Sequence, residues 1–456
     1  MFEPLARRRR RPALILGALA AAGALTLTAA CSTPTVGIQA EAAGTTSADA
    51  VDWSGVTPAS EITWWSNHPG SSQKVEEELI RRFEAENPDI TVKLVTAGAN
   101  YDEVAQRFQA ASQTSELPDL VIASDVWWFR YHLNDQILAL DEVFEAIDAD
   151  AADFNPALYG DYEYDGAHWA APYARSTPLF YYNKDMWAAA GLPDRGPETW
   201  AEFAQWGAQL DAQVPADSAP LGLATGTSWA AWWFENMIWG HGGEYSDGWD
   251  TTLTSPEALE AGEFLRDLFH GSKVATVSTD ANADFSAGVV AATIGSTGSL
   301  KGILDAASFE VGTAYLPQGP DGGGTPTGGT GLAIPSSRPV ENQLAAATFL
   351  KFLTSTDSTA YFSQNTGYMP VRTSAVESDD MKAVYAATPQ FRTAVDQLAD
   401  RARSQDWIRV FVPGADQILT EAIEQIVLKG VDPQTAFEGI TPQLETAYRE
   451  NVEPYL

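Results

Sequence analysis

Short apolar strands alternate with amphipathic helices in the first third of the chain, and this alternation constrains the fold more than any other feature. The apolar runs over 62–65, 90–94 and 120–123 predict three strands. Apolar residues at helical spacing predict helices near 74–87 and 101–113 between them. A β-α-β-α-β order predicts an α/β fold, with a mostly parallel sheet that carries helices on both faces.

The loops that follow these strands are the first candidates for a ligand site. Ligands of open α/β sheets bind beyond the carboxyl ends of the strands. The loops over 66–72, 97–101 and 124–128 occupy those positions. These three loops are therefore the candidates for the ligand site.

The rest of the chain continues the pattern with more helix than strand. A strand is expected over 179–183, and Ser255 followed by Pro256 is typical of a helix start, with Ser as N-cap and Pro in the first turn. Further helices are expected near 198–210, 341–354, 382–403, 416–429 and 433–450.

The N-terminal segment has the composition of an export signal. A basic block over 7–11 precedes an apolar stretch that ends at residue 30, so 1–30 is interpreted as a signal peptide. The only cysteine, Cys31, follows small residues at its end and resembles the lipidated cysteine of a bacterial lipoprotein. The following segment, 31–60, is rich in Ser, Thr, Ala, Gly and Pro, which predicts a flexible tether. An uncleaved membrane helix and an incidental cysteine are the alternative interpretations.

The composition excludes several classes of function. The chain has 61 acidic and 27 basic residues, a formal charge of −34, which argues against nucleic-acid binding. One cysteine excludes a disulfide framework, and the five histidines show no metal-ligand spacing, so we expect no metal and no cofactor. No phosphate-binding loop or nucleophile elbow is present. With so many acids, a glycosidase pair of carboxylates stays open as an alternative.

Five sequence motifs in order resemble the solute-binding proteins of carbohydrate-type ABC importers. Over a region of roughly 61–450, these motifs are Arg82–Pro88, Pro172–Asp185, Gly295–Ser299, Gly328–Ile334 and Thr366–Val371. The resemblance implies a two-lobed periplasmic-binding-protein fold of type II, in which each lobe is a mostly parallel sheet flanked by helices and is discontinuous in sequence. The implied division is 61–172 plus about 290–335 for lobe 1, and 173–289 plus about 336–456 for lobe 2.

The resemblance also implies a function without catalysis. Proteins of this family are monomeric receptors at the extracytoplasmic face of the membrane, and here the anchor would be the lipid on Cys31. They trap a small polar ligand between the lobes and deliver it to the transmembrane subunits of an ABC permease.

Within the family, the chain is most similar to the branch of sn-glycerol-3-phosphate-binding proteins. Asp125 stands where that branch has a glutamate, and the match at Trp229 needs a one-residue gap. The ligand-contacting positions of the branch correspond to Tyr101, Asp125, Ser176, Trp229, Ser296, Gly329, Tyr368 and Arg409.

The chemistry of these residues suits a polyol phosphate. A guanidinium such as that of Arg409 can donate two charge-assisted hydrogen bonds to a phosphate. The carboxylate of Asp125 accepts hydrogen bonds from hydroxyl groups, and the ring of Trp229 offers an apolar face to C–H groups. Together with this chemistry, the resemblance implies capture of glycerol 3-phosphate or a glycerophosphodiester.

Each of these residues also has a structural interpretation. Arg409 can pair with a neighbouring acid, the aromatic residues can belong to the core, and the serines and Gly329 can serve as caps or turns. A neutral mono- or oligosaccharide is the alternative ligand. An acidic chain repels a phosphate, within the screening length of about 8 Å at physiological salt, whereas a neutral sugar is not repelled. An exported glycoside hydrolase is the alternative class. The sequence leaves open whether Arg175 contributes to the site.

Overall fold

The computed structural model describes residues 53–456 except 113, 115, 227 and 228. The signal peptide expected over 1–30, Cys31 and most of the expected tether lie outside these residues. No helix within the described part of the chain combines the length and apolar character that crossing a membrane requires.

A five-stranded sheet forms the core of the first lobe, in the order β2-β1-β3-β15-β6. The strands β1, β2 and β3 run parallel, and β15 is antiparallel to both of its neighbours. The bounds of the strands are Glu61–Ser66 (β1), Thr91–Thr96 (β2), Leu120–Ser124 (β3), Ala171–Ser176 (β6) and Gly328–Ala333 (β15). The predicted β-α-β-α-β unit is confirmed, with α1 at Gln73–Glu86 and α2 at Tyr101–Ala111.

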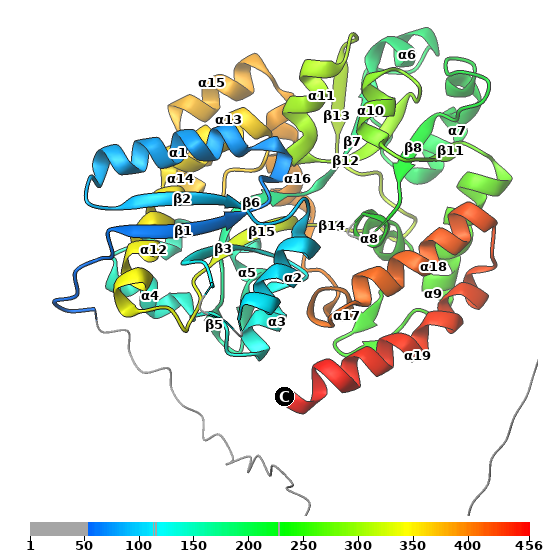
Figure 1. Cartoon of the computed structure of the whole chain (residues 1–456). Coiled ribbons are helices and arrows are strands. Elements are labelled where there is room, and N and C mark those ends of the chain that lie inside the picture. Colours follow the sequence, from blue (N-terminus) through cyan, green and yellow to red (C-terminus); the bar gives the residue numbers. More distant parts are fainter. Residues whose placement is uncertain (1–52, 113, 115, 227–228) are drawn as a thin grey trace, which may run out of the picture. The chain divides into compact units, whose positions relative to one another are not determined.

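A second five-stranded sheet, in the order β11-β8-β12-β7-β13, forms the core of the second lobe (Figure 1). The strands β8, β11 and β12 run parallel, and β7 is antiparallel to β12 and β13. The bounds are Pro178–Asn183 (β7), Leu221–Ala224 (β8), Ala275–Ser278 (β11), Ala292–Ser296 (β12) and Val311–Ala314 (β13).

The one reversed strand of each sheet is the strand that arrives from a crossing between the lobes. β6 ends at Ser176 and β7 begins at Pro178, so one residue, Thr177, separates the two sheets. The return crossing runs from β14, Thr325–Pro326, into β15. These two crossings are hydrogen-bonded to each other, because the hydroxyl of Thr177 donates to the carbonyl of Pro326 at 3.0 Å. The chain passes to the second lobe again between residues 376 and 390.

Helices cover both sheets, as expected for an α/β fold. α12 packs on β1, and α18 and α19 lie side by side next to α9 (Figure 1). The other helices of the first lobe are α3 Trp128–Leu133, α4 Leu140–Ala146, α5 Pro156–Gly160, α12 Val340–Leu353, α13 Thr356–Thr366 and α14 Thr373–Val376. Those of the second are α6 Lys184–Ala189, α7 Trp200–Asp211, α8 Ala230–Gly240, α9 Pro256–Arg266, α10 Ala281–Ser286, α11 Leu300–Ala306, α16 Gln390–Arg401, α17 Trp407–Phe411, α18 Ala415–Lys429 and α19 Pro433–Asn451. α15 Asp379–Ala387 joins the two lobes and contacts α13, α14 and α16.

The remaining elements are short and join the larger ones. They are the strands β4 Glu163–Tyr164, β5 Ala167–His168, β9 Ser246–Asp247, β10 Asp250–Thr251 and β16 Ala402–Arg403, and the single turns η1 Pro69–Ser71, η2 Ala151–Asp153, η3 Asp267–Gly271, η4 Thr297–Ser299 and η5 Glu453–Tyr455.

Two expectations differ from the structure. The helix expected near 382–403 is two helices, because Thr388 before Pro389 adopts an extended φ of −140° and ends α15. The expected lobe bounds are also wrong: within 290–335, β12 and β13 complete the second sheet while β15 lies in the first. The first lobe also continues to Ser176 at the end of β6, and it contains the helices over 340–376, which were expected in lobe 2. The sheet to which a strand belongs depends on long-range pairing, which local sequence patterns do not show.

Candidate functional site

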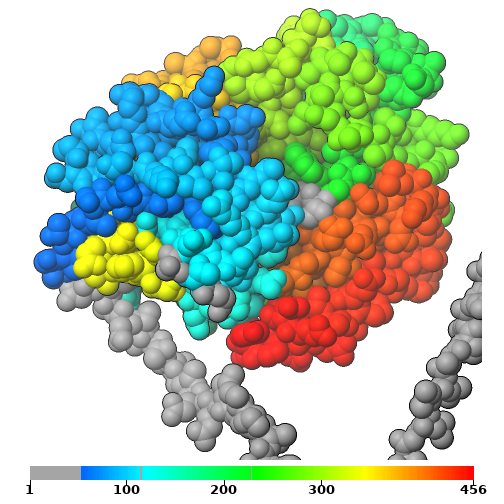
Figure 2. Space-filling view, viewed as in Figure 1, coloured from blue at the N-terminus to red at the C-terminus, as the bar shows by residue number. Residues whose placement is uncertain are grey.

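A cavity of about 450 Å³ lies where the two sheets meet at their crossings. Its lining comes from both lobes, and Figure 2 shows the cyan surface around residues 100–130 facing green and orange surface of the second lobe. All eight residues expected to contact a ligand line this one cavity: Tyr101, Asp125, Ser176, Trp229, Ser296, Gly329, Tyr368 and Arg409.

The first lobe contributes residues from the strand ends that the α/β pattern pointed to. Tyr101 opens α2, where the side chain of Asn100 accepts a hydrogen bond from the amide of Glu103 at 2.9 Å and caps the helix. Asp125 follows β3, and its amide donates to the carbonyl of Gly329 at 3.2 Å. Ser176 is the last residue of β6.

Gly329 sits where a side chain has no room. Its φ is +100°, and a Cβ there would lie 2.1 Å from the carbonyl oxygen of Ala174 in the neighbouring strand. This glycine therefore allows β15 and β6 to approach closely beside the cavity. Gly329 therefore serves the backbone, as one interpretation of the sequence expected, and it also lines the cavity.

The second lobe contributes an aromatic ring and a capping serine. Trp229 directly precedes α8 and packs edge-to-face against Trp232, with ring centroids 6.0 Å apart. Ser296 ends β12, and its hydroxyl accepts a hydrogen bond from the amide of Gly298 at 3.1 Å. The capping interpretation of Ser296 is thus confirmed, although the residue also lines the cavity.

Arg409 on α17 is nearly inaccessible, at 2% exposure, and is already paired with acids. Its Nε lies 2.9 Å from Oδ1 of Asp416, and its Nη1 lies 3.7 Å from Oε2 of Glu235. Burial opposes the positive charge of Arg409, but these two acids outweigh it and raise its pKa above the usual value. Burial raises the pKa of Glu235 well above its usual range, although Arg409 acts in the opposite direction. The acids hold the guanidinium in place at the cavity wall.

Two tyrosine hydroxyls complete the polar lining. Burial raises the pKa of Tyr368 to about 12, and it raises the pKa of Tyr101 well above the usual value. Both phenols therefore stay protonated at neutral pH. Their hydroxyls are hydrogen-bonded to each other, so the pair retains one proton to donate to an anion or a hydroxyl group.

Gln405 is a site residue that the sequence did not indicate. Its Nε2 donates to Oδ2 of Asp125 at 2.9 Å, and its Oε1 accepts from Nη1 of Arg409. Gln405 thereby links the acidic and the basic residue of the site. Asp125 and Gln405 are 280 positions apart, and no local pattern relates them.

Arg175 does not line this cavity. The side chain is fully buried, pairs with Asp161 and donates to the hydroxyl of Tyr162 at 2.9 Å. Asp161 also accepts from Thr327, the residue between β14 and β15. Arg175 therefore stabilises the crossing between the lobes.

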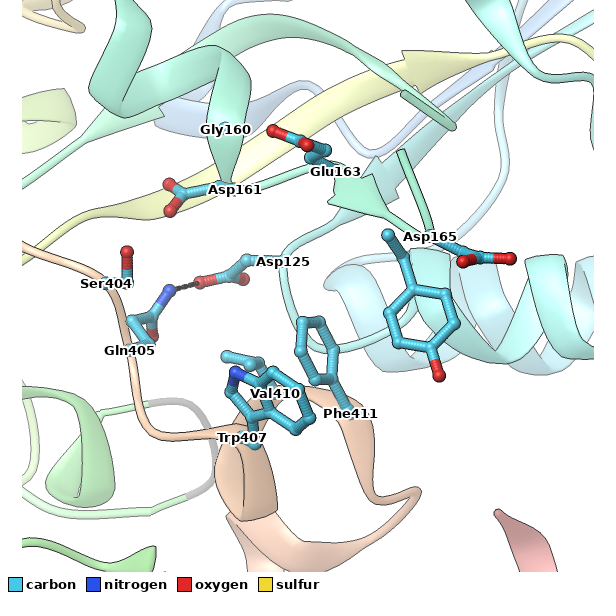
Figure 3. Close-up of a pocket in the computed structure, with 11 residues that line it drawn as sticks. Asp125, Gly160, Asp161, Glu163, Asp165, Ser404, Gln405, Trp407, Val410 and Phe411 are labelled. Atoms are coloured by element: carbon cyan, nitrogen blue, oxygen red, sulfur yellow. Dashed lines mark hydrogen bonds between the residues drawn. The ribbon is translucent and has the colours of Figure 1, made fainter. Parts of the chain in front are cut away.

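A second cavity of about 400 Å³ adjoins the first at Asp125 (Figure 3). Residues of the segment 160–165 face residues of 404–411 across it. The lining contains the acids Asp125, Asp161, Glu163 and Asp165, together with the aromatic residues Tyr164, Trp407 and Phe411. Across the described part of the chain, no three His, Cys, Asp or Glu residues are grouped closely enough to hold a metal ion.

Comparisons with known proteins place the chain in a family. A profile of the family described as bacterial extracellular solute-binding protein matches residues 78–393. The sn-glycerol-3-phosphate-binding periplasmic protein UgpB of Escherichia coli K12 is 28% identical over 360 residues, which cover 75% of this chain and 81% of UgpB. The same protein of Salmonella typhimurium is 29% identical over equal shares of both chains.

Solved structures agree with this placement. The structure of UgpB from Mycobacterium tuberculosis, in complex with glycerophosphocholine, is 45% identical, with a TM-score of 0.82 over 86% of this chain and 99% of the other. The GacH receptor of Streptomyces glaucescens, a complex of which contains acarbose, has a TM-score of 0.73 at 22% identity over 87% of this chain and 99% of the other, a likeness of fold. The profile match and the two-lobed fold agree, and the chain belongs to the family of bacterial extracellular solute-binding proteins.

Proposed function

We propose that this protein is the substrate-binding subunit of an ABC importer and that it captures a glycerophosphodiester or glycerol 3-phosphate. The observation that carries this proposal is that the eight residues matched to the glycerol-3-phosphate-binding branch all line one cavity between the lobes. The 45% identity with a UgpB that holds glycerophosphocholine supports the same ligand class.

The proposed pose places the phosphate at Arg409 and the glycerol hydroxyls near Asp125. Because Asp416 and Glu235 fix the guanidinium, Arg409 pays little additional entropy when it binds an anion. The hydrogen-bonded pair of hydroxyls of Tyr101 and Tyr368 supplies one further donor. The side chain of Trp229 covers the carbon skeleton of the ligand.

In this proposal the protein transports and does not catalyse. Closure of the lobes around the crossings at Thr177 and Thr327 buries the ligand, and the closed form docks on the transmembrane permease. The proposed receptor acts as a monomer, outside the cytoplasmic membrane. A neutral saccharide is the alternative ligand, since the acarbose receptor GacH shares the fold.

We also propose that the protein is a lipoprotein anchored through Cys31. Removal of the signal at 1–30 would make Cys31 the modified N-terminus, and 31–60 would be the tether. Replacement of Cys31 by serine should release the protein from the membrane fraction of expressing cells. Retention in the membrane after this change would contradict the anchor.

Calorimetric titration tests the ligand class. Glycerophosphocholine and glycerol 3-phosphate should bind to the purified domain, while maltose and trehalose should give no heat of binding. The variant Arg409→Lys keeps a charge beside Asp416 and Glu235 but loses the planar fork, so affinity for the phosphorylated ligands should fall at least about tenfold. Thermal unfolding of the variant serves as the folding control. Unchanged affinity, or saccharide binding alone, would overturn the phosphate proposal.

A further inference from the structure

We propose that Glu235, buried behind Arg409, makes anion capture depend on pH: the site binds a phosphodiester while Glu235 carries a proton and loses affinity when Glu235 ionises. Glu235 is then a positioning residue that acts through Arg409, since it does not itself line the cavity. This inference rests on the proposed function and deepens it, because it adds a regulation to the same site.

An excess of buried acids around Arg409 is the first argument. Four acids and one base, each at most 7% exposed, form a connected group: Glu235, Asp406, Asp416, Asp125 and Arg409. Gln405 bonds to both Asp125 and Arg409, and the amide of Asp406 donates to Oε1 of Glu235 at 3.2 Å. If every acid were ionised, four negative charges would face one positive charge before any ligand arrived. Because buried like charges oppose ionisation, a further anion favours a neutral form of at least one of these acids.

The titratable groups next to this buried group do not remove the excess. Arg403 lies near Asp406, but its side chain is 38% exposed and pairs with Glu244. Tyr245 also faces Glu235, and burial raises the pKa of Tyr245 well above its usual value, so this phenol is neutral. Arg409 is therefore the cation that the buried acids share.

Two of the acids are held in their ionised form. Oδ2 of Asp406 accepts from the amide of Tyr245 at 2.6 Å, and Oδ1 accepts from Nε1 of Trp239 at 3.1 Å. Donors of this kind favour a carboxylate. Burial raises the pKa of Asp406 to about 6, so this acid is still ionised at neutral pH. Asp416 lies 2.9 Å from Nε of Arg409, which favours its charge as well.

Glu235, on α8, lacks this support. Its side chain is fully buried, and no residue in the described part of the chain forms a hydrogen bond with its Oε2. Nη1 of Arg409 lies 3.7 Å from that oxygen, beyond hydrogen-bond distance. A buried charge without hydrogen bonds costs more than a neutral carboxyl group in the same place. Burial raises the pKa of Glu235 well above its usual range, Arg409 opposes this, and Asp406 and Asp125 reinforce it.

An anion at Arg409 strengthens the preference of Glu235 for a proton. The ligand shares the guanidinium that would otherwise stabilise ionised Glu235, so the pKa of Glu235 should be higher in the complex than in the free protein. By linkage, affinity is highest below the pKa of the free protein, falls as the pH rises through it, and levels off above the pKa of the complex. Between these two values, binding takes up a proton.

Calorimetric titration with glycerophosphocholine at several pH values tests this inference. Its phosphodiester keeps one charge throughout, whereas the phosphate of glycerol 3-phosphate has a second pKa of about 6. Glu235→Gln mimics the neutral acid, and Glu260→Gln, which changes an exposed residue of α9 outside both cavities, is the control. From about pH 7 to about pH 9, we expect wild type and control to lose at least about tenfold in affinity, and Glu235→Gln less than about threefold.

Proton uptake is a second measurement that needs no variant. Titration of wild type at about pH 8, in two buffers with different ionisation enthalpies, gives the number of protons taken up for each ligand bound. We expect net uptake in wild type and a smaller value in Glu235→Gln. His68, whose pKa is also raised and which neighbours the cavity, is present in both proteins and cancels in their comparison.

The outcomes separate this inference from the proposed function. No proton uptake by wild type, or an equal fall in affinity for wild type and Glu235→Gln, would overturn the role of Glu235 and leave the proposed function intact. If wild type binds no phosphorylated ligand at any pH, both proposals fail. Thermal unfolding of each protein at each pH distinguishes a loss of affinity from a loss of fold.

Discussion

Gln405 donates a hydrogen bond from Nε2 to Oδ2 of Asp125 at 2.9 Å, and this bond connects the segment before α17 to the loop after β3. It crosses from one lobe to the other beside the cavity, so it stabilises the arrangement in which the lobes are close together. A hydrogen bond to a charged acceptor contributes about 1.5–3 kcal/mol.

Replacement of Gln405 by leucine should therefore shift the ligand-free protein toward an open form. The radius of gyration from small-angle scattering is expected to increase. The matched control is Gln390→Leu, because Gln390 bonds to the carbonyl of Val311 within the second lobe. An equal radius for Gln405→Leu and wild type would show that the bond does not influence the opening of the lobes.

Adding a single methyl group at Gly329 should strongly destabilise the folded protein. A Cβ at this position would lie 2.1 Å from the carbonyl oxygen of Ala174, and a φ of +100° is unfavourable for alanine. We expect Gly329→Ala to lower the free energy of unfolding by at least about 2 kcal/mol. Gly302→Ala is the control, since it lies in α11 with open space around it and should stabilise the protein by up to about 1 kcal/mol. Urea denaturation measures both variants.

Much of this fold follows from local patterns. The start of α9 at Pro256, with the hydroxyl of Ser255 accepting from the amide of Ala258, is a local signal and was predicted from those two residues. The α/β class was also predicted from the sequence, because the spacing of apolar residues shows which side of a helix or strand is buried. The assignment of β12 and β13 to the second sheet did not follow, since strand pairing depends on residues far apart in sequence.

The candidate site, like the fold, was predicted only in part from the sequence. The family resemblance selected eight residues that the fold brings to one cavity, and their role in binding remains a prediction. The structural interpretation that Arg409 pairs with a neighbouring acid is confirmed, but local sequence did not identify Glu235 and Asp416 as the partners. Local sequence did not indicate Gln405 or the second cavity either.

Substitution of Arg175 should lower the stability of the protein without directly changing its affinity for the ligand. Its buried pair with Asp161 should make Arg175→Met destabilising by about 3–5 kcal/mol, because the carboxylate is left without its partner. The double variant Arg175→Met with Asp161→Asn should recover a large part of that loss. Titration with glycerol 3-phosphate at a temperature where the variants are folded should give an affinity within about twofold of wild type. A much weaker affinity would place Arg175 in the binding machinery.

Protonation of His68, next to the cavity, should make the stability of the folded protein depend on pH. Its Nδ1 bonds to Glu76, which raises the pKa of His68 above 6.5, and the neighbouring Pro69 and Gly70 line the cavity. The folded state therefore holds the proton more tightly than the unfolded state. The stabilisation is complete below pH 6.5 and is lost as the pH rises through the raised pKa.

NMR titration of the imidazole signals measures this effect directly. His68 should titrate above 6.5, and His132, whose pKa burial lowers, should titrate below that value as an internal reference. In Glu76→Gln the pKa of His68 should fall, while that of His132 should not change. A pKa of His68 that does not respond to Glu76→Gln would contradict the assignment of the pair.

The crossings at Thr177 and Thr327 have a consequence for inheritance as well as for motion. Since β7 enters the second sheet directly from the first, β15 returns to the first sheet after β14, and the chain passes to the second lobe again between α14 and α16, neither lobe is encoded by one continuous stretch of gene. A recombination event with a breakpoint between these crossings would exchange portions of both halves at once. Among proteins with this arrangement of the chain, ligand preference should therefore change mainly by point substitution, and not by the exchange of whole lobes.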